Sequence, residues 1–590
     1  IISNTGILNM DVGELLNFKP TVTPKRPSSD DYFEDEPKRK IKPVSSSDVP
    51  RKMKKIVSNE PNFIAPVEIE FQKKKEKDIP AEDDDLKKVV QLLEQDDNPE
   101  ILDEGALKKM LLTFEKRVLK NQELRIKFPD MPEKFMESEI ELNEAVQELH
   151  AVATAPDLYS ILVDLNVIGS IMGLLSHENT DISIAVVDLI QELTDVDTLN
   201  ESEEGANVLI ECLLDHQICA LLVQNVERLD ESVREENDGV HNTLGIIENI
   251  LEFKPDVCVT FAQQGLLQWL LKRQKVKVPF DGNKLYCGEI LSILLQESSE
   301  TKKMIGDMDG IDILLQQLAF YKRHDPNSAE EYEFMENLFD CLCSCLMLPA
   351  NRDKFLKGEG LQLMNLMLRE KKVSRNGALK VLNHALVGRD GTDNCNKFVE
   401  ILGLRTIFPI FMKTPKKQRR KGLSVDEHEE HVCSVLAAML HNCRGSHYQR
   451  IISKFVENDH EKVDRLIELH FKYLERVRVV DIALDKERRR LMFTVGSVNA
   501  DKEDEFYLRR LDEGLFTLQL IDYIILEVGV NGAPSIRQRI MQILSVHGES
   551  VKTIKSIMTD YASSLGDNLS NEGREEEEQR ILSLVEKFGN

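Results

Sequence analysis

The chain of 590 residues is poor in aromatic side chains and has no long apolar run. Phe, Trp and Tyr make up 6% of it, and Trp269 is its one tryptophan. No stretch approaches the roughly 18–20 apolar residues that a helix needs to cross a bilayer, so we expect no contact with a membrane. Sustained alternation of apolar and polar residues, the pattern of a half-buried strand, is also missing. Leucine and isoleucine must therefore supply the core, which favours an all-α fold.

The sequence lacks the motifs by which many enzymes are recognised. It contains no Gly-rich phosphate loop, no nucleophile elbow and no paired CxxC. His428 and His431 are spaced i, i+3 rather than i, i+4, so with Cys433 they form a poor metal site. We therefore predict a protein that is not an enzyme and that has no metal or other cofactor.

The ten cysteines fall between residues 212 and 443 without the paired spacing of a disulfide framework. Cys341, Cys343 and Cys345 form the densest group. On a helix the first and last of these share a face, and Cys343 points elsewhere. We interpret the cysteines as buried helical thiols of a protein in a reducing compartment.

Negative charge belongs to the body of the protein rather than to its N-terminal segment. The net charge is -27, yet residues 1–84 hold 15 Lys and Arg against 16 Asp and Glu. A surface as acidic as that of the remaining residues repels phosphate backbones, so we expect no direct binding of nucleic acid by the body. Basic segments of other proteins are better candidates for its partners.

Residues 1–84 have few apolar side chains to bury and are predicted to be a disordered tail. Two basic clusters in it are separated by eleven residues, the form of a bipartite nuclear localisation signal that importin-α would bind. The alternative is a solvated charge run. Ser28 and Ser29 lie in the spacer, where phosphorylation would tune the signal. The predicted signal consists of Lys25, Arg26, Lys38, Arg39 and Lys40.

Helical periodicity begins near Leu86, and an apolar helix recurs after a glycine four times. These glycines, at intervals of 45, 50 and 43 residues, are Gly265, Gly310, Gly360 and Gly403. A period in the forties made of helices is typical of stacked helical repeats, because one unit cannot bury its apolar face alone. The sequence therefore predicts a helical solenoid.

Longer blocks of the chain resemble a known family. Residues 168–193 fit the armadillo pattern of an apolar helix ending in two leucines, a turn and a long third helix. The blocks "MDVGELL", "NQELRIKFPDMPEKFMESE", "NTDISIAVVDLIQELTD" and "FLKGEGLQLMNLMLREKK" are similar to those of the beta-catenin-like family. The similarity runs from Met10 nearly to the C-terminus.

The resemblance implies an armadillo/HEAT-like right-handed superhelical solenoid with helical caps at both ends. We predict a disordered tail with the localisation signal in 1–84, an N-terminal helical cap in 85–165, armadillo-like repeats in 166–445 and a C-terminal helical region in 446–590. The resemblance further implies a nuclear protein that associates with the spliceosome through the nineteen complex. Such a protein would bind basic segments of splicing factors that resemble nuclear localisation signals. The family is also linked to activation-induced cytidine deaminase.

The third helices of armadillo repeats place one polar residue near their ends in a partner-binding groove. Aligning the repeats puts Glu192, Asn249, Ser344, His384 and Asn442 at this position. One turn earlier the alignment puts Asp188, Gly245, Asp340, Lys380 and Ala438. The carboxylates among them are candidates to bind Lys or Arg of a partner, and the alternative is that they are merely solvated. Asp188, Glu192, Asn249, Asp340, His384 and Asn442 are the predicted groove residues.

The predicted function is that of a scaffold in the nucleus for protein interactions of pre-mRNA splicing. An importin-like transport adaptor is the alternative. Importin grooves use a ladder of tryptophans at the earlier position, where this chain has none. A catenin-type scaffold at the membrane is a weaker alternative, and a homodimer stays open.

Overall fold

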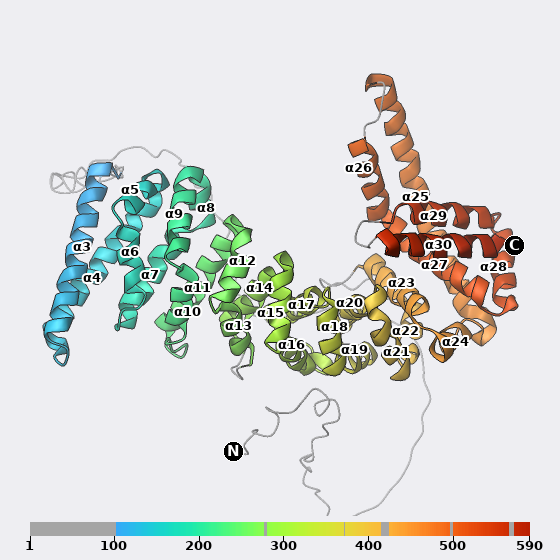
Figure 1. The fold of residues 1–590 in the computed structure, drawn as a ribbon, viewed down its shortest axis with the longest axis horizontal. Coiled ribbons are helices and arrows are strands. Elements are labelled where there is room, and N and C mark those ends of the chain that lie inside the picture. Colours follow the sequence, from blue (N-terminus) through green and yellow to red (C-terminus); the bar gives the residue numbers. More distant parts are fainter. Residues whose placement is uncertain are drawn as a thin grey trace, which may run out of the picture. The chain divides into compact units, whose positions relative to one another are not determined.

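Helices build all of the fold that the computed structural model describes (Figure 1). The described residues are 102–275, 280–370, 372–414, 424–495, 500–565 and 571–589, and they contain no strand. They belong to one unit of the chain. The predicted all-α class is therefore confirmed.

Two long antiparallel helices open the described chain. In α3 (Glu104–Lys127) the buried residues Leu107, Leu111, Phe114 and Val118 follow helical spacing, and they pack on α4 (Met136–Leu149). Asp103 caps α3 by accepting a hydrogen bond from the backbone N–H of Ala106 at 2.6 Å. Short 3-10 turns follow each helix, namely η1 (Pro132–Lys134), η2 (His150–Thr154) and η3 (Pro156–Leu158).

Six triplets of helices follow, each with two shorter helices and a longer third one. The first three are α5 (Tyr159–Asp164), α6 (Val167–Leu174) and α7 (Thr180–Leu193); α9 (Glu203–Asp215), α10 (Ile218–Val226) and α11 (Arg234–Phe253); and α12 (Cys258–Gln263), α13 (Leu266–Lys275) and α14 (Gly282–Glu297). Between these triplets lie α8 (Val196–Glu201) and η4 (Pro255–Val257).

The second three triplets repeat the same order. They are α15 (Ser299–Asp307), α16 (Gly310–Leu318) and α17 (Ala329–Cys345); α18 (Pro349–Lys357), α19 (Gly360–Arg369) and α20 (Arg375–Leu386); and α21 (Thr392–Glu400), α22 (Leu404–Phe411) and α23 (Val425–Asn442). Two 3-10 turns, η5 (Ala319–Lys322) and η6 (Arg389–Gly391), lie among them. The first triplet begins at Tyr159, whereas the sequence predicted that the repeats start at residue 166. The domain boundaries stay a prediction.

The turn before each second helix contains one residue with positive φ. These residues, 43 to 51 positions apart, are Asn166, Gln217, Gly265, Asp309, Glu359 and Leu402. Only Gly265 itself has positive φ, so three of the four periodic glycines serve another purpose. A Cβ on Gly360 would lie 2.2 Å from a ring carbon of Phe355, and one on Gly310 would lie 2.2 Å from Ile305. These glycines let consecutive helices approach closely.

Side-chain caps start most of the third helices. The capping oxygens accept hydrogen bonds from the first turn and belong to Asn179, Asp281, Ser328 and Ser424. Ser424 forms a capping box in which Glu427 accepts a hydrogen bond from the backbone of Ser424. Each of these caps marks the residue at which a third helix begins.

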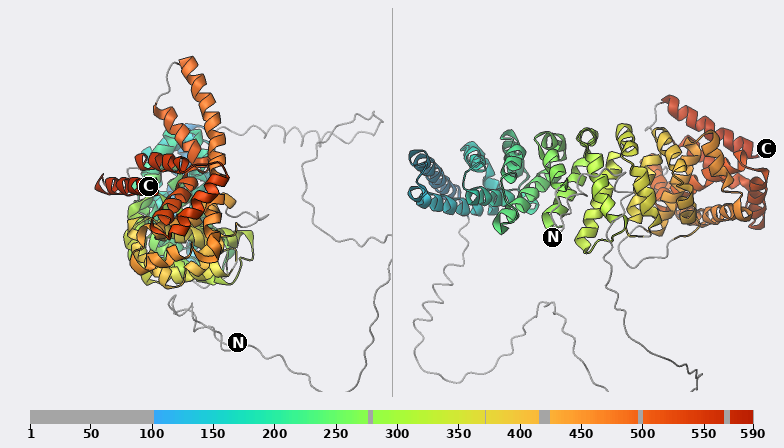
Figure 2. Two further views of the ribbon diagram at one scale, coloured as in Figure 1. Left: turned by 90° about the vertical axis from the view of Figure 1, so that its right-hand side faces the viewer. Right: turned by 90° about the horizontal axis from the view of Figure 1, so that it is seen from below.

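The third helices pack side by side in chain order, α7 on α11, α11 on α14, α14 on α17, α17 on α20 and α20 on α23. The right-hand view of Figure 2 shows the same order of the triplets from below. A continuous set of buried apolar residues runs through all of them. Each triplet thus buries its apolar faces against its neighbours, as a solenoid does.

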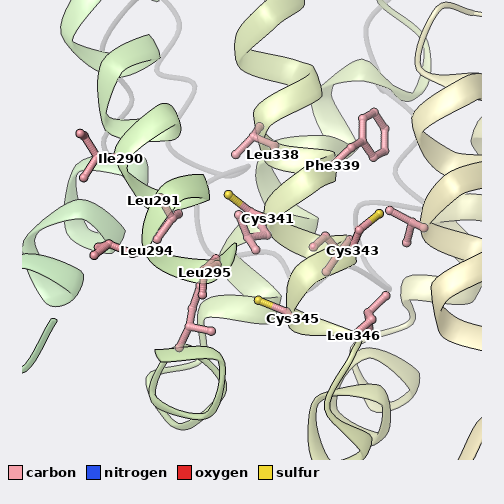
Figure 3. Packing of buried hydrophobic residues seen from close by; sticks show 14 of the residues in the cluster. Ile290, Leu291, Leu294, Leu295, Leu338, Phe339, Cys341, Cys343, Cys345 and Leu346 are labelled. Atoms are coloured by element: carbon pink, nitrogen blue, oxygen red, sulfur yellow. The ribbon is translucent and has the colours of Figure 1, made fainter. Parts of the chain in front are cut away.

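The cysteine-rich segment lies within this core (Figure 3). Cys341 and Cys345 are both 0% exposed and point to the side of α17 that meets Leu291 and Leu295 of α14. Cys343, 4% exposed, points to the opposite side. The predicted burial and the predicted division between two faces are confirmed.

Eight further helical elements form the described C-terminal region. They are α24 (Gly445–Ser453), α25 (Glu457–Val495), α26 (Ala500–Arg510), the π-turn η7 (Leu511–Leu515), α27 (Phe516–Asn531), α28 (Pro534–Val546), α29 (Val551–Ser563) and α30 (Asn571–Gly589), where η7 joins α26 to α27. Positive φ angles at residues 458–460 bend the start of α25. The helix α27 packs against α23 and therefore continues the row of third helices.

Across the described part of the chain, no single helix is long and apolar enough to span a membrane. Two bent pairs satisfy the criteria of length and composition together, and these are Pro156–Asp164 with Val167–Leu174 and Glu203–Asp215 with Ile218–Val226.

Candidate partner-binding face

Each third helix buries most of its surface and leaves one polar stripe. On α7 the residues Ile182, Val186 and Leu189 are at most 1% exposed, whereas Asp188 and Glu192, one turn apart, keep access to solvent. We define the third-helix face as the equivalent polar residues of successive third helices. They are Asp188, Glu192, Asn242, Glu248, Asn249, Glu289, Glu333, Glu336, Asp340, Lys380, His384 and His431.

At its first helices the face presents two carboxylates. Asp188 Oδ1 accepts a hydrogen bond from Asn242 Nδ2 of α11 at 2.8 Å, and burial raises the pKa of the Asp188 carboxyl. Glu192 Oε2 lies 2.6 Å from His150 Nδ1, yet the Glu192 side chain is 51% exposed. Both predicted residues thus lie together, and Glu192 is the more accessible.

The middle of the face holds carboxylates that the sequence alignment did not identify. Glu248 of α11 accepts a hydrogen bond from the hydroxyl of Tyr286 on α14. Burial, and then the charges of Glu333 and Glu248, raise the pKa of Glu289 on α14. The predicted Asn249 is partly buried next to Glu248. The alignment had assigned no residue of α14 to the groove.

On α17 and α20 one carboxylate is already neutralised by the chain itself. Lys380 Nζ of α20 lies 2.5 Å from Asp340 Oδ1 of α17. Burial, followed by the nearby Asp340 charge, raises the pKa of Glu336 to about 7, and Lys380 acts against this rise. The predicted Asp340 is therefore paired with Lys380. The carboxyl of Glu336 is the one on this face whose pKa is raised close to neutral pH.

Two histidines on the last third helices of the face are neutral. Burial, and then Lys380, lower the pKa of His384, and burial lowers the pKa of His431 to about 4. Both imidazoles are uncharged at neutral pH. Asn442, another predicted groove residue, is 5% exposed, and its Nδ2 donates to the carbonyls of Leu386 and Gly388 at 3.1 and 2.7 Å. Its amide serves the chain's own backbone, so we leave it out of the face.

The charges of the face therefore change along the row. Carboxylates dominate from α7 to α17, and Lys380 and the two neutral histidines follow. The one tryptophan, Trp269, lies on α13 and is 8% exposed, so no tryptophan ladder accompanies the carboxylates. Among the described residues no group of three or more His, Cys, Asp and Glu is arranged to hold a metal ion.

The predicted localisation signal, Lys25, Arg26 and Lys38–Lys40, lies outside the described residues.

Repeated helix triplets whose third helices line up a polar face define an armadillo-type protein. The match to the family model "Catenin-beta-like, Arm-motif containing nuclear" covers residues 85–559. The chain belongs to this catenin-beta-like family, which confirms the resemblance seen in its sequence blocks. Family and fold together support a scaffold for protein interactions, in a family described as nuclear.

Relatives at two evolutionary distances support the assignment. The chain is 63% identical to beta-catenin-like protein 1 of Homo sapiens over 487 residues, which cover 82% of this chain and 86% of that protein. It is 35% identical to the beta-catenin-like protein 1 homolog of Schizosaccharomyces pombe over 430 residues, 72% of this chain and 73% of that one.

Two solved structures are distantly similar to this chain. A beta-catenin structure from work on its interaction with cadherin has a TM-score of 0.43 at 13% identity, covering 76% of this chain and 78% of that one. The complex of SYS-1 with POP-1 has a TM-score of 0.44 at 10% identity, covering 80% and 85%.

Proposed function

We propose that this protein is a nuclear scaffold of the pre-mRNA splicing machinery and binds basic segments of partner proteins along the third-helix face. The observation that carries the proposal is the run of carboxylates on four successive third helices, from Asp188 on α7 to Glu336 on α17. The link to splicing and to the nineteen complex rests on the family resemblance.

Binding would use the spacing of the carboxylates. An extended segment that crosses successive third helices would bring its Lys and Arg side chains to one carboxylate after another. Charge-assisted hydrogen bonds of this kind are about twice as strong as neutral ones. Glu192 is the first contact we assign, because its side chain is 51% exposed. The acidic body, part of a chain of net charge -27, would also steer cationic segments toward the face.

An importin-like adaptor is the second candidate, and the structure gives it little support. Importin-type grooves hold extended peptides with tryptophans, and Trp269 is nearly buried on a second helix. We expect importin-α to be a partner of the N-terminal signal rather than a protein that this chain replaces.

Charge reversal on α7 tests the proposed face. Replacing Asp188 and Glu192 with Lys should weaken binding of a fluorescein-labelled lysine-rich peptide by roughly a hundredfold or more, because two charge-assisted contacts of about 1.5–3 kcal/mol each are lost. Fluorescence anisotropy gives the Kd, which should also rise with salt. The matched control reverses Asp130 and Glu133, which are exposed and lie off the face.

Equal weakening in both variants would leave only diffuse attraction and refute a specific face. The splicing role has its own readout. Splicing-complex proteins should co-purify from nuclei with the unmodified protein and with the control variant, and much less with the Asp188 and Glu192 reversal. Their absence from all three purifications would contradict the splicing assignment.

A further inference from the structure

A cavity of about 210 Å³ lies between α23 and the C-terminal helices, beyond the last charged residues of the third-helix face. The turn after α20 forms part of its lining. Its lining comes from segments far apart in the chain, and consists of Val387, Gly388, Arg389, Ser434, Ala437, Ala438, His441, Phe516, Gln519, Leu520, Tyr523, Tyr561, Leu565 and Glu577. Ala438 is one of the positions that the sequence alignment assigned to the groove, so the cavity continues the same row of helices.

The walls of the cavity are mostly apolar. Phe516, 38% exposed, and Leu565 line the cavity together with the small residues Ala437 and Ala438, whose short side chains take up little of the space. The ring of Tyr561 completes this wall. Sites for drug-sized ligands usually measure about 300–1,000 Å³, so this volume suits one long side chain better than a whole cofactor.

Both arginines beside the cavity are already engaged. Arg389 Nη1 lies 2.8 Å from Glu576 Oε2, and its Nη2 donates to the carbonyl of Gly573 at 3.1 Å. Arg580 Nη2 lies 2.6 Å from Glu527 Oε1. Each guanidinium therefore has a glutamate of its own.

Arg444 is the remaining cation nearby. It is exposed, and its Nη1 donates to the backbone carbonyl of Cys443 at 2.8 Å. It does not line the cavity. Burial raises the pKa of the Glu577 carboxyl in the cavity, and the charges of Arg580, Arg389 and Arg444 act against this rise.

Glu577 is the one carboxylate that lines the cavity, and its side chain is 16% exposed. Within the described residues its only ion-pair neighbour inside 4 Å is His441, whose Nδ1 lies 3.5 Å from Glu577 Oε1. That nitrogen accepts a hydrogen bond from Arg580 Nη1 at 2.5 Å. Burial and then Arg580 lower the pKa of His441 to about 3, so the imidazole is neutral and donates nothing to Glu577. Among the described residues, therefore, no charged cation lies within 4 Å of this carboxylate.

We propose that this cavity binds one lysine side chain from the basic segment of a partner protein. The methylene stem would lie against Phe516, Leu565 and the ring of Tyr561, and the ammonium group would reach Glu577 and the aromatic faces. An apolar wall with a single carboxylate, which no charged cation of the described residues approaches within 4 Å, is complementary to this side chain. The inference rests on the proposed function and extends it to a defined anchoring site at the end of the face.

The test uses the full chain and a fluorescein-labelled peptide with one cluster of four lysines. In each of four further peptides, one lysine is replaced by norleucine, which keeps the stem and removes the charge. Glu577→Gln removes the carboxylate charge with little change of shape. Glu575→Gln, an exposed change on the same helix, is the matched control.

We expect Glu577→Gln to bind the parent peptide roughly tenfold more weakly than the control, as for the loss of one charge-assisted contact. With the unmodified chain, norleucine at one particular position should cost about the same factor, and with Glu577→Gln it should cost little. This coupling would identify the lysine that enters the cavity.

Equal affinities of Glu577→Gln and Glu575→Gln would overturn the proposal, and so would tighter binding of a norleucine peptide, which would indicate an apolar occupant. The Asp188 and Glu192 reversal distinguishes a failure of the anchoring site from a failure of the proposed function. If it weakens binding while Glu577→Gln does not, the anchoring site is wrong and the proposed function stands. If the lysine peptide does not bind the unmodified chain, both are wrong.

Discussion

Glu336 makes the stability of the protein depend on pH in a direction that is unusual for a carboxyl. Its pKa is about 7 in the folded protein against the ordinary 4.5, chiefly because burial disfavours its charge. Between these two values the folded state binds more protons at this site than the unfolded chain does. The contribution of Glu336 to the free energy of unfolding therefore falls as the pH rises from 4.5 to 7, and stays low above 7.

The size of the effect follows from the difference in pKa. A difference of about 2.5 corresponds to about 3 kcal/mol, which is an upper limit because the carboxyl keeps some contact with solvent, which screens its charge. Glu336→Gln removes the charge, so we expect this variant to be more stable than the unmodified protein by about 1–2 kcal/mol at pH 8 and by almost nothing at pH 4.5.

Urea unfolding followed by far-ultraviolet circular dichroism measures the difference at each pH. Glu330→Gln, on the exposed first turn of the same helix, is the control, and its difference from the unmodified protein should not change with pH. A Glu336→Gln difference that is the same at pH 4.5 and pH 8 would refute the reasoning, because it would show that the carboxyl is not held protonated by its surroundings.

Two further predictions concern the close helix contact and the tail. Gly360→Ala should lower the free energy of unfolding by about 2–3 kcal/mol, since its Cβ would lie 2.2 Å from the buried Phe355 ring. In thermal unfolding the control Gly173→Ala, with no atom within 4 Å of the new Cβ, should not lower Tm, and a similar loss in both would point to the helix backbone instead. Replacing Lys38–Lys40 with Ala should move a fluorescent fusion toward the cytoplasm, and unchanged nuclear fluorescence would mean that a partner carries the protein in.

The helix triplets could be predicted from sequence because their signal is local. Apolar residues at helical spacing and glycines at near-regular intervals indicated repeats. The same glycines were informative for a different reason than turn geometry: Gly360 and Gly403 stand where a side chain would collide with Phe355 and Phe398. The sequence shows the position of such a glycine, and only the packed helices show what it avoids.

The polar face was harder to predict because it depends on neighbouring helices. Asp188 and Glu192 could be found by their place on α7, but Asp340 is paired with Lys380 from the next third helix. The environment of Glu336 likewise comes from two helices. Asn442 stands at the end of α23, where its amide turns back to the carbonyls of Leu386 and Gly388. The cavity at Glu577 joins residues almost two hundred positions apart and leaves no local pattern.

The burial of the thiols has a consequence for the chemistry of the whole solenoid. Nine of the ten cysteines are buried and one is partly buried. Burial also raises the pKa of thiols such as Cys219, so the reactive thiolate is scarce while the helices stay packed. Oxidants and alkylating reagents would reach the nine buried sulfur atoms only when adjacent triplets separate. The rate at which these thiols are oxidised therefore depends on how often neighbouring repeats separate. A partner that spans several repeats would hold them together and so protect the thiols from oxidation.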